Sequence, residues 1–107
     1  MLNHFGRLLP QITECFRTGG GVPYAAYRPG FTETMDDTWR RIYDEHLVGG
    51  FLGAVDGLTA RLEAGIAALD IGCGTGQAIN LMAARFPRSR FAGYDLGEDA
   101  IAHARAE

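Results

Sequence analysis

Glycines at alternate positions, followed by a later aspartate, are the residues of this sequence whose types and spacing best indicate a ligand. Gly72, Gly74 and Gly76 follow a short apolar run, and Asp95 ends the next apolar run. A turn without side-chain bulk lets a flat or charged ligand rest against the backbone. The free N–H groups that open the next helix attract anionic groups. A carboxylate after the neighbouring strand can accept hydrogen bonds from two ribose hydroxyls, so these residues together indicate a nucleoside site.

A dinucleotide-binding turn is the nearest alternative, and one position separates the two kinds of site. The dinucleotide fingerprint is G-x-G-x-x-G. Counted from Gly72, its sixth position here is Gln77, and Asp70 stands just before the turn. This difference favours a nucleoside ligand over a dinucleotide. An oxidoreductase that binds NAD remains the alternative enzyme class, and a non-catalytic regulatory module with a remnant nucleoside site is a third hypothesis.

The elements that must position these residues are two strands and two helices. Residues 66–71 form a nearly continuous apolar run, typical of a strand buried on both faces of a parallel sheet. The glycine-rich turn leads into an expected helix near 77–86, then a strand over 91–95 and a helix from 98 to 107. Strand, helix, strand, helix with short links predicts a βαβα unit with a parallel sheet and a right-handed crossover.

Helices are expected in the N-terminal part of the chain, packed on or beside this unit. Pro10 lies inside the first helical pattern and is expected to kink it. Thr34 with Asp37 resembles a capping box for the second helix, and Gly49 and Gly50 are expected to end that helix. The expected order is a helix over about 3–17, an ordered loop or short helical turn over 19–30, a helix over 33–47 and an amphipathic stretch over 52–65.

Two motifs carry a resemblance to a known family. Residues 69–76, Leu-Asp-Ile-Gly-Cys-Gly-Thr-Gly, resemble the first motif of class I S-adenosylmethionine-dependent methyltransferases, and residues 91–96, Phe-Ala-Gly-Tyr-Asp-Leu, are similar to their second motif. The resemblance implies S-adenosylmethionine as cofactor and methyl transfer to an unidentified acceptor. It also implies an α/β fold with a partial Rossmann-like, doubly wound parallel sheet. Residues 66–107 would be its first βαβα unit, and residues 1–65 a helical N-terminal or cap region.

The same resemblance implies a set of cofactor-binding residues, whereas no catalytic base is assigned. The glycines would pack beneath the methionine and ribose, Asp70 would receive the methionine ammonium, and Asp95 would bind the ribose hydroxyls with Leu96 near the adenine. Cys73 is interpreted as a small loop residue rather than a nucleophile, because no histidine lies near it in sequence. The implied cofactor-binding residues are Asp70, Gly72, Cys73, Gly74, Gly76, Asp95 and Leu96.

Tyr24 and Tyr27 admit two interpretations. In several class I methyltransferases a segment before the first strand closes over the cofactor with an aromatic or hydroxyl group. The alternative is packing of these rings onto the helix that carries Trp39. The segment 19–28 with that helix also resembles a bacterial group in which a winged-helix dimerisation domain precedes the methyltransferase domain.

Composition and charge indicate which binding partners and which cellular location to expect for the protein. With 47% hydrophobic and 21% charged residues, the 107-residue chain has an ordinary globular composition. A net charge of −3 shows no electrostatic footprint for nucleic acid. Cys15 and Cys73 have neither CxxC spacing nor a histidine partner, so no metal site is expected. A secretory pattern and a membrane-spanning apolar run are both missing from the sequence, which predicts a cytoplasmic protein with reduced thiols.

Only two strands can be recognised, although the resembled family has a larger sheet. We therefore interpret the chain as a truncated product or a fragment of a longer enzyme. Two parallel strands leave edges and a face uncovered. Exposed apolar surface of this kind predicts homo-oligomerisation, aggregation or partial disorder.

Overall fold

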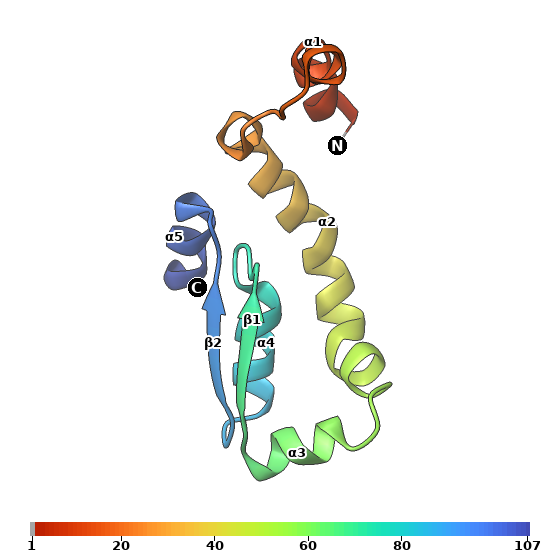
Figure 1. The fold of residues 1–107 in the computed structure, drawn as a ribbon. Coiled ribbons are helices and arrows are strands. Elements are labelled where there is room, and N and C mark those ends of the chain that lie inside the picture. Colours follow the sequence, from red (N-terminus) through yellow and green to blue (C-terminus); the bar gives the residue numbers. More distant parts are fainter. Residues whose placement is uncertain (1) are drawn as a thin grey trace.

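The computed structural model describes residues 2–107 as a helical N-terminal part followed by an α/β unit (Figure 1). The predicted order of strand, helix, strand and helix is confirmed. Among residues 2–107, no helix is both long and apolar enough to cross a membrane. The elements are α1 (Leu2–Thr18), the 3-10 helix η1 (Tyr24–Tyr27), α2 (Gly30–His46), the π-helical turn η2 (Leu47–Leu52), α3 (Leu58–Ala64), β1 (Ala67–Ile71), α4 (Gln77–Arg85), β2 (Arg90–Tyr94) and α5 (Glu98–Ala106).

The two strands pair in parallel, as predicted. Ala67 lies opposite Arg90, and Ile71 lies opposite Tyr94 at the other end of the ladder. Because both strands run in the same direction, their carboxyl ends share one edge of the sheet (Figure 1). The segments that follow them, the glycine-rich turn and Asp95, are therefore brought to the same place.

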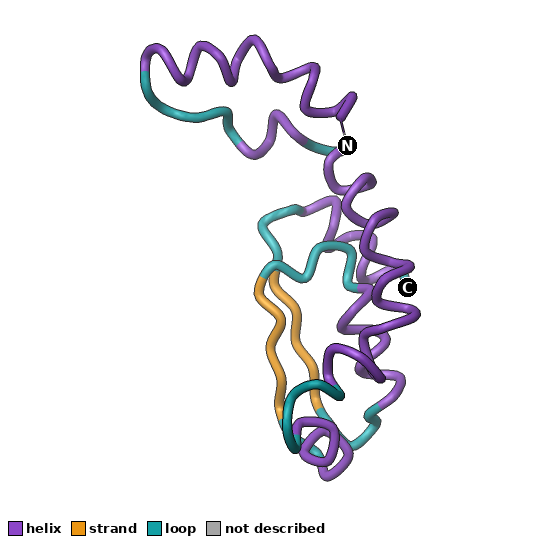
Figure 2. The backbone as a smooth tube through the Cα atoms, turned by 90° about the vertical axis from the view of Figure 1, so that its right-hand side faces the viewer, coloured by secondary structure: helices purple, strands orange, loops and turns teal. Residues whose placement is uncertain are grey.

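One face of this sheet is open. Figure 2 shows helices on one side of the two strands only. The side chains on the other side are exposed, with 81% of the surface of Ile71 and 66% of that of Tyr94 accessible. Residues 66–71 have the pattern of a strand buried on both faces, yet no element covers the second face within residues 2–107, as expected when only two strands are present. Exposed apolar surface on this unit is confirmed, whereas oligomerisation stays a prediction.

Helix α2 departs from the expected pattern at both ends. It begins at Gly30 with Pro29 as its N-cap, so Thr34 lies inside the helix. The Thr34 hydroxyl donates to the carbonyl of Gly30 at 2.8 Å, a bond within the helix, and the predicted capping box is wrong. Gly49 and Gly50 do not end the helical path either, because η2 carries it on as a wider turn to Leu52.

Helix α1 lies at the end of α2 that is remote from the sheet, whereas α2 runs alongside the α/β unit (Figure 1). The helical path of α1 continues on both sides of Pro10. Its Phe5 ring meets those of Tyr27 and Phe31 edge to face, with centroids 6.1 and 6.0 Å apart. Aromatic packing therefore connects α1 to η1 and to the first turn of α2.

The best-buried side chains lie where α3 and the end of α4 meet the start of the strands. Leu62 and Phe86 are 2% and 1% exposed. Ser89 joins the same region, because its hydroxyl donates to the carbonyl of Leu62 at 2.6 Å and accepts from the N–H of Ile66 at 3.0 Å. Gly65 closes α3 with φ +106, and a Cβ there would lie 2.9 Å from the carbonyl oxygen of Arg88. These contacts hold the sheet at the end opposite the glycine-rich turn.

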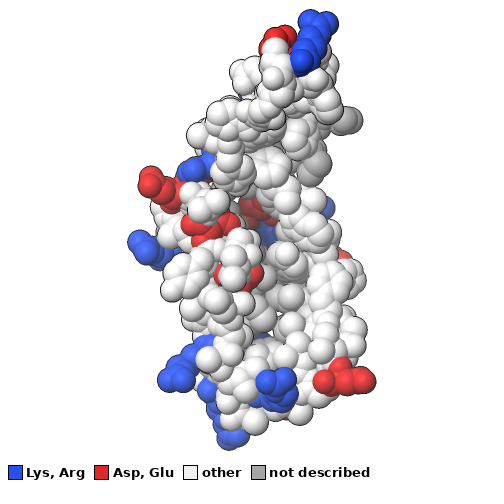
Figure 3. Space-filling model, in the orientation of Figure 1, with Lys and Arg blue, Asp and Glu red and all other residues white. Residues whose placement is uncertain are grey.

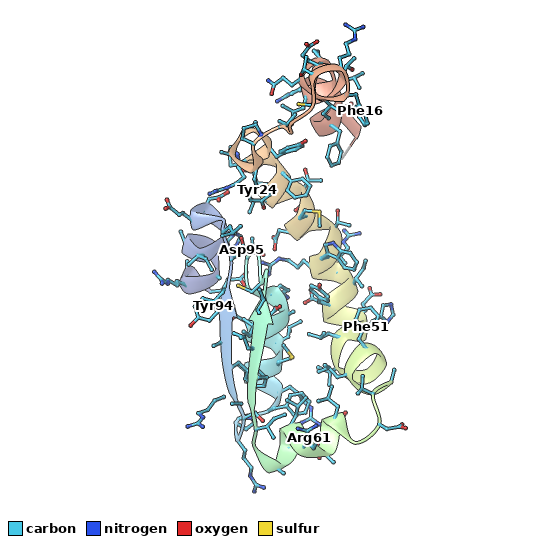
Figure 4. The ribbon with its side chains drawn as sticks, in the orientation of Figure 1. Phe16, Tyr24, Phe51, Arg61, Tyr94 and Asp95 are labelled. Carbon is cyan, nitrogen blue, oxygen red and sulfur yellow. The ribbon has the colours of Figure 1, made fainter. Side chains whose placement is uncertain are left out.

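Phe86→Ala should lower the free energy of unfolding by about 3 kcal/mol, because it removes a fully buried ring and leaves a cavity. Urea denaturation followed by circular dichroism measures this loss. Phe16→Ala is the matched control, since Phe16 is 88% exposed and lies on α1 far from the sheet (Figure 4). Equal losses for the two variants would contradict the location of the core.

Candidate functional site

The glycine turn, residues 72–76, has a backbone that favours glycine. Gly72, Gly74 and Gly76 have φ values of +86, +54 and +84, in the left-handed region that side chains disfavour. A Cβ at Gly72 or Gly74 would meet nothing within 4 Å, so space for a ligand is open above the turn. A Cβ at Gly76 would lie 2.7 Å from Cβ of Ala104, because α5 packs directly against the turn there. Two of the glycines thus face free space and the third permits helix packing.

Hydrogen bonds to Asp95 connect this turn to the end of β2. Its Oδ2 accepts the N–H of Gly74 at 2.8 Å, and its Oδ1 accepts the N–H of Gly97 at 2.7 Å. The carbonyl of Tyr94 also accepts the N–H groups of Gly72 and Cys73, at 2.7 and 3.1 Å. Each carboxylate oxygen has a further lone pair after these bonds, so Asp95 can still accept hydroxyl protons from a ligand.

Cys73 packs inward from the turn. A Cβ on Gly93 would lie 2.8 Å from its sulfur, which shows how closely β2 approaches the thiol. Burial raises the pKa of the Cys73 thiol, and the negative charges of Asp70 and Asp95 raise it further. A thiol with a raised pKa stays protonated at neutral pH and is a poor nucleophile. This supports the interpretation of Cys73 as a small loop residue.

A cavity of about 270 Å³ lies between the glycine turn and α2. Figure 3 shows this face hollowed between the α/β unit and the long helix, with acidic and basic atoms visible inside the hollow. Of the residues that the sequence predicted, it brings together Gly72, Cys73, Gly74 and Asp95. Most of the remaining wall comes from η1 and α2, elements to which the motifs assign nothing, and the rest is Thr75, Gln77 and Ala100.

Three predicted residues do not line this cavity. Gly76 is buried behind the turn. Asp70 faces a second cavity of about 330 Å³, whose lining includes Leu62 and Met82. Leu96 is 89% exposed. Asp70 belongs to the inward-facing set of β1, and alternation along the strand turns it to the face on which α4 lies.

Four polar residues that sequence reasoning missed join α2 to the turn, and we call them the polar clamp: Asp36, Arg40, Thr75 and Gln77. The Thr75 hydroxyl donates to the carboxylate of Asp36. Arg40 donates to Asp36 at 3.1 Å and to Oε1 of Gln77 at 2.6 Å. It also pairs with Glu107, at 2.6 Å. The spacing of Asp36 and Arg40, four residues apart on a helix, was the available signal, although it did not reveal their contact with the turn.

The charged pair of the polar clamp is ionised at neutral pH. Partial burial raises the pKa of Asp36, but hydrogen bonds from Arg40 and Thr75 outweigh it and the pKa lies below its usual value. The hydrogen bond to Asp36 raises the pKa of Arg40 above its usual value. The two charges therefore neutralise each other beside the cavity.

The two tyrosines of η1 differ in position. Tyr24 lines the cavity, and its ring meets that of Phe31 edge to face at 6.3 Å. Tyr27 meets Phe31 at 6.2 Å and lines a separate cavity with residues of α1. Both rings therefore pack near the first turn of α2, the helix that carries Trp39. Arg28 pairs with Asp99 of α5, a contact that joins this segment to the α/β unit.

Fold and site together define the class of protein. It has a parallel α/β unit with a cavity at the carboxyl ends of its strands. A family model described as a methyltransferase domain matches residues 62–107, which cover this unit and the last residues of α3. The match confirms the resemblance to methyltransferases that the two motifs indicate. Among curated proteins, none matches the chain.

Asp36→Asn should destabilise the fold by about 1.5 kcal/mol at pH 7, because it weakens a charged hydrogen bond to Arg40. A carboxyl whose pKa is lowered by folding stabilises the protein above its unfolded pKa, and that stability is lost as the pH falls through the folded pKa. The difference between wild type and variant should therefore shrink between pH 5 and pH 3, roughly the range of such carboxyl titrations.

Thermal unfolding at a series of pH values measures this difference. Asp37→Asn is the control, since Asp37 is the exposed neighbour on the same helix. A difference that stays constant down to pH 3, or an equal effect of Asp37→Asn, would contradict the role of the polar clamp.

Proposed function

We propose that this chain binds S-adenosylmethionine in the cavity between the glycine turn and α2, and serves methyl transfer. The contact between the N–H of Gly74 and the carboxylate of Asp95, at 2.8 Å, carries this proposal. It joins a glycine-rich turn to a carboxylate at the carboxyl ends of two parallel strands, where nucleosides bind in open α/β sheets. The methyltransferase match over residues 62–107 supports the cofactor assignment.

The residues of the turn that line the cavity fit this cofactor. Open space above Gly72 and Gly74 leaves room for a ligand that a Cβ would obstruct. In our proposal the turn holds the methionine and ribose portions, and Asp95 accepts the ribose hydroxyl protons. Asp70 and Leu96, which lie outside the cavity, are assigned from the two motifs: Asp70 to the methionine ammonium and Leu96 to the adenine.

When bound, S-adenosylmethionine supplies a methyl group on a positively charged sulfur, which is the reactive part of such a reaction. The chain's own contribution is then to align the donor and the acceptor and to exclude water. We assign cofactor binding to residues 66–107. In our proposal these residues are the first βαβα unit of a Rossmann-like doubly wound sheet. Residues 1–65 act as the helical cap whose α2 closes the cavity.

Asp95→Ala should weaken the binding of S-adenosylmethionine by about tenfold or more, because it removes a charged acceptor of two ribose hydroxyls. Isothermal titration calorimetry measures this on the full chain. Since Asp95 also accepts from Gly74 and Gly97, Asp95→Asn serves as a milder variant that keeps one acceptor oxygen. Asp56→Ala, at an exposed turn, is the matched control.

Tight binding of NAD with none of S-adenosylmethionine would overturn the proposal and favour the oxidoreductase hypothesis. Unchanged binding in both Asp95 variants would contradict the assigned site even if the cofactor is right.

A further inference from the structure

Helix α2 presents an apolar row to the same cavity. Four side chains spaced four residues apart all line it: Phe31, Met35, Trp39 and Tyr43. We call these four residues the aromatic row, because three of them are aromatic. At a rise of about 1.5 Å per residue, the row extends over about 18 Å of the helix. Residues at this spacing share one face of a helix, so the row is a continuous apolar strip opposite the glycine turn.

The polar clamp determines which way this strip faces. Asp36 and Arg40 lie on α2 beside the row and reach Thr75 and Gln77 at the end of the glycine turn. With these contacts made, α2 cannot rotate about its axis without breaking charged hydrogen bonds. The aromatic row is thereby held toward the cavity.

The rings of the row remain accessible to a ligand. Trp39 is 40% exposed, although it is the largest apolar side chain of α2. It stacks on Tyr43, with ring centroids 5.6 Å apart and an angle of 24° between the planes. Tyr24 of η1 lines the same cavity and is also exposed. Aromatic surface of this kind binds flat rings by offset or edge contacts.

The charged side chains of α2 beside the row already have partners. The carboxylate of Asp36 accepts from Arg40 and Thr75, so a cationic ligand would have to compete with Arg40 for it. Arg40 in turn pairs with Asp36 and Glu107, which leaves it poorly placed to bind an anion. A charged ligand on the row would lose hydration and would find both Asp36 and Arg40 already engaged. The row therefore favours a neutral ligand.

We propose that the aromatic row binds the methyl acceptor, and that the acceptor is a flat, neutral, largely apolar small molecule. This rests on the proposed function, because the opposite wall of the cavity, formed by the glycine turn and Asp95, is assigned to the cofactor. The two walls face each other across one cavity, so an acceptor on the row lies next to a cofactor on the turn.

Ligand-observed NMR titrations of the full chain test this with two probes of equal ring size. 2-Naphthol is flat and neutral, and 2-naphthylmethylamine carries a positive charge at pH 7. We expect 2-naphthol to bind at least about threefold more tightly than the amine. Its affinity should be the same in the presence of saturating S-adenosylhomocysteine. Trp39→Leu should weaken 2-naphthol binding by about tenfold, while S-adenosylhomocysteine binding changes less than about twofold.

Phe51→Leu is the matched control, because Phe51 is an exposed aromatic residue of η2 that does not line the cavity (Figure 4). It should leave 2-naphthol binding unchanged. Retained S-adenosylhomocysteine binding in Trp39→Leu also shows that the variant is folded.

Several results would overturn the inference. Absence of 2-naphthol binding, tighter binding of the amine, or an unaltered affinity in Trp39→Leu would each do so. Equal weakening of 2-naphthol and S-adenosylhomocysteine in Trp39→Leu, or competition between them, would assign the row to the cofactor instead. If wild type binds 2-naphthol through Trp39 but does not bind S-adenosylhomocysteine, the proposed function fails while the flat-ligand site stands.

Discussion

The carboxylate of Asp95 is the constraint on which the site depends. It accepts the N–H of Gly74 on one side and the N–H of Gly97 on the other, so the two segments that follow the strands are held together by one side chain. Charged hydrogen bonds to backbone N–H groups are stronger than neutral ones. A turn that would otherwise be a mobile glycine-rich loop thus becomes a defined wall.

The second wall of the cavity is formed mainly by helix α2. Helix α2 comes from the N-terminal part and is joined to the turn by Asp36 and Arg40, through Thr75 and Gln77. One wall therefore offers backbone and a carboxylate, suited to a nucleoside, and the other offers rings. These unlike walls are compatible with the polar cofactor and the apolar acceptor that we propose.

The structure differs from what the sequence pattern indicates at the two ends of α2 and in the burial of β1. Thr34 has the right type for a cap, yet α2 begins at Gly30 and turns Thr34 into an interior residue. Gly49 and Gly50 weaken a helix, yet a wider turn accommodates them. The apolar run of β1 has the pattern of a strand covered on both faces, while helices cover one face only (Figure 2). Burial depends on which elements are packed there, and periodicity reports only which faces are apolar.

The sequence by itself determined the strand–turn–helix elements, because hydrophobic periodicity and the left-handed backbone at Gly72, Gly74 and Gly76 are local properties. The parallel pairing of β1 with β2 followed from the strand–helix–strand order with short links. Only the tertiary structure decided that α2 faces the glycine turn. That arrangement requires Asp36 to meet Thr75, a contact across 39 positions of the chain. No local pattern encodes such a contact, since it depends on how the intervening helices and turns direct the chain back on itself.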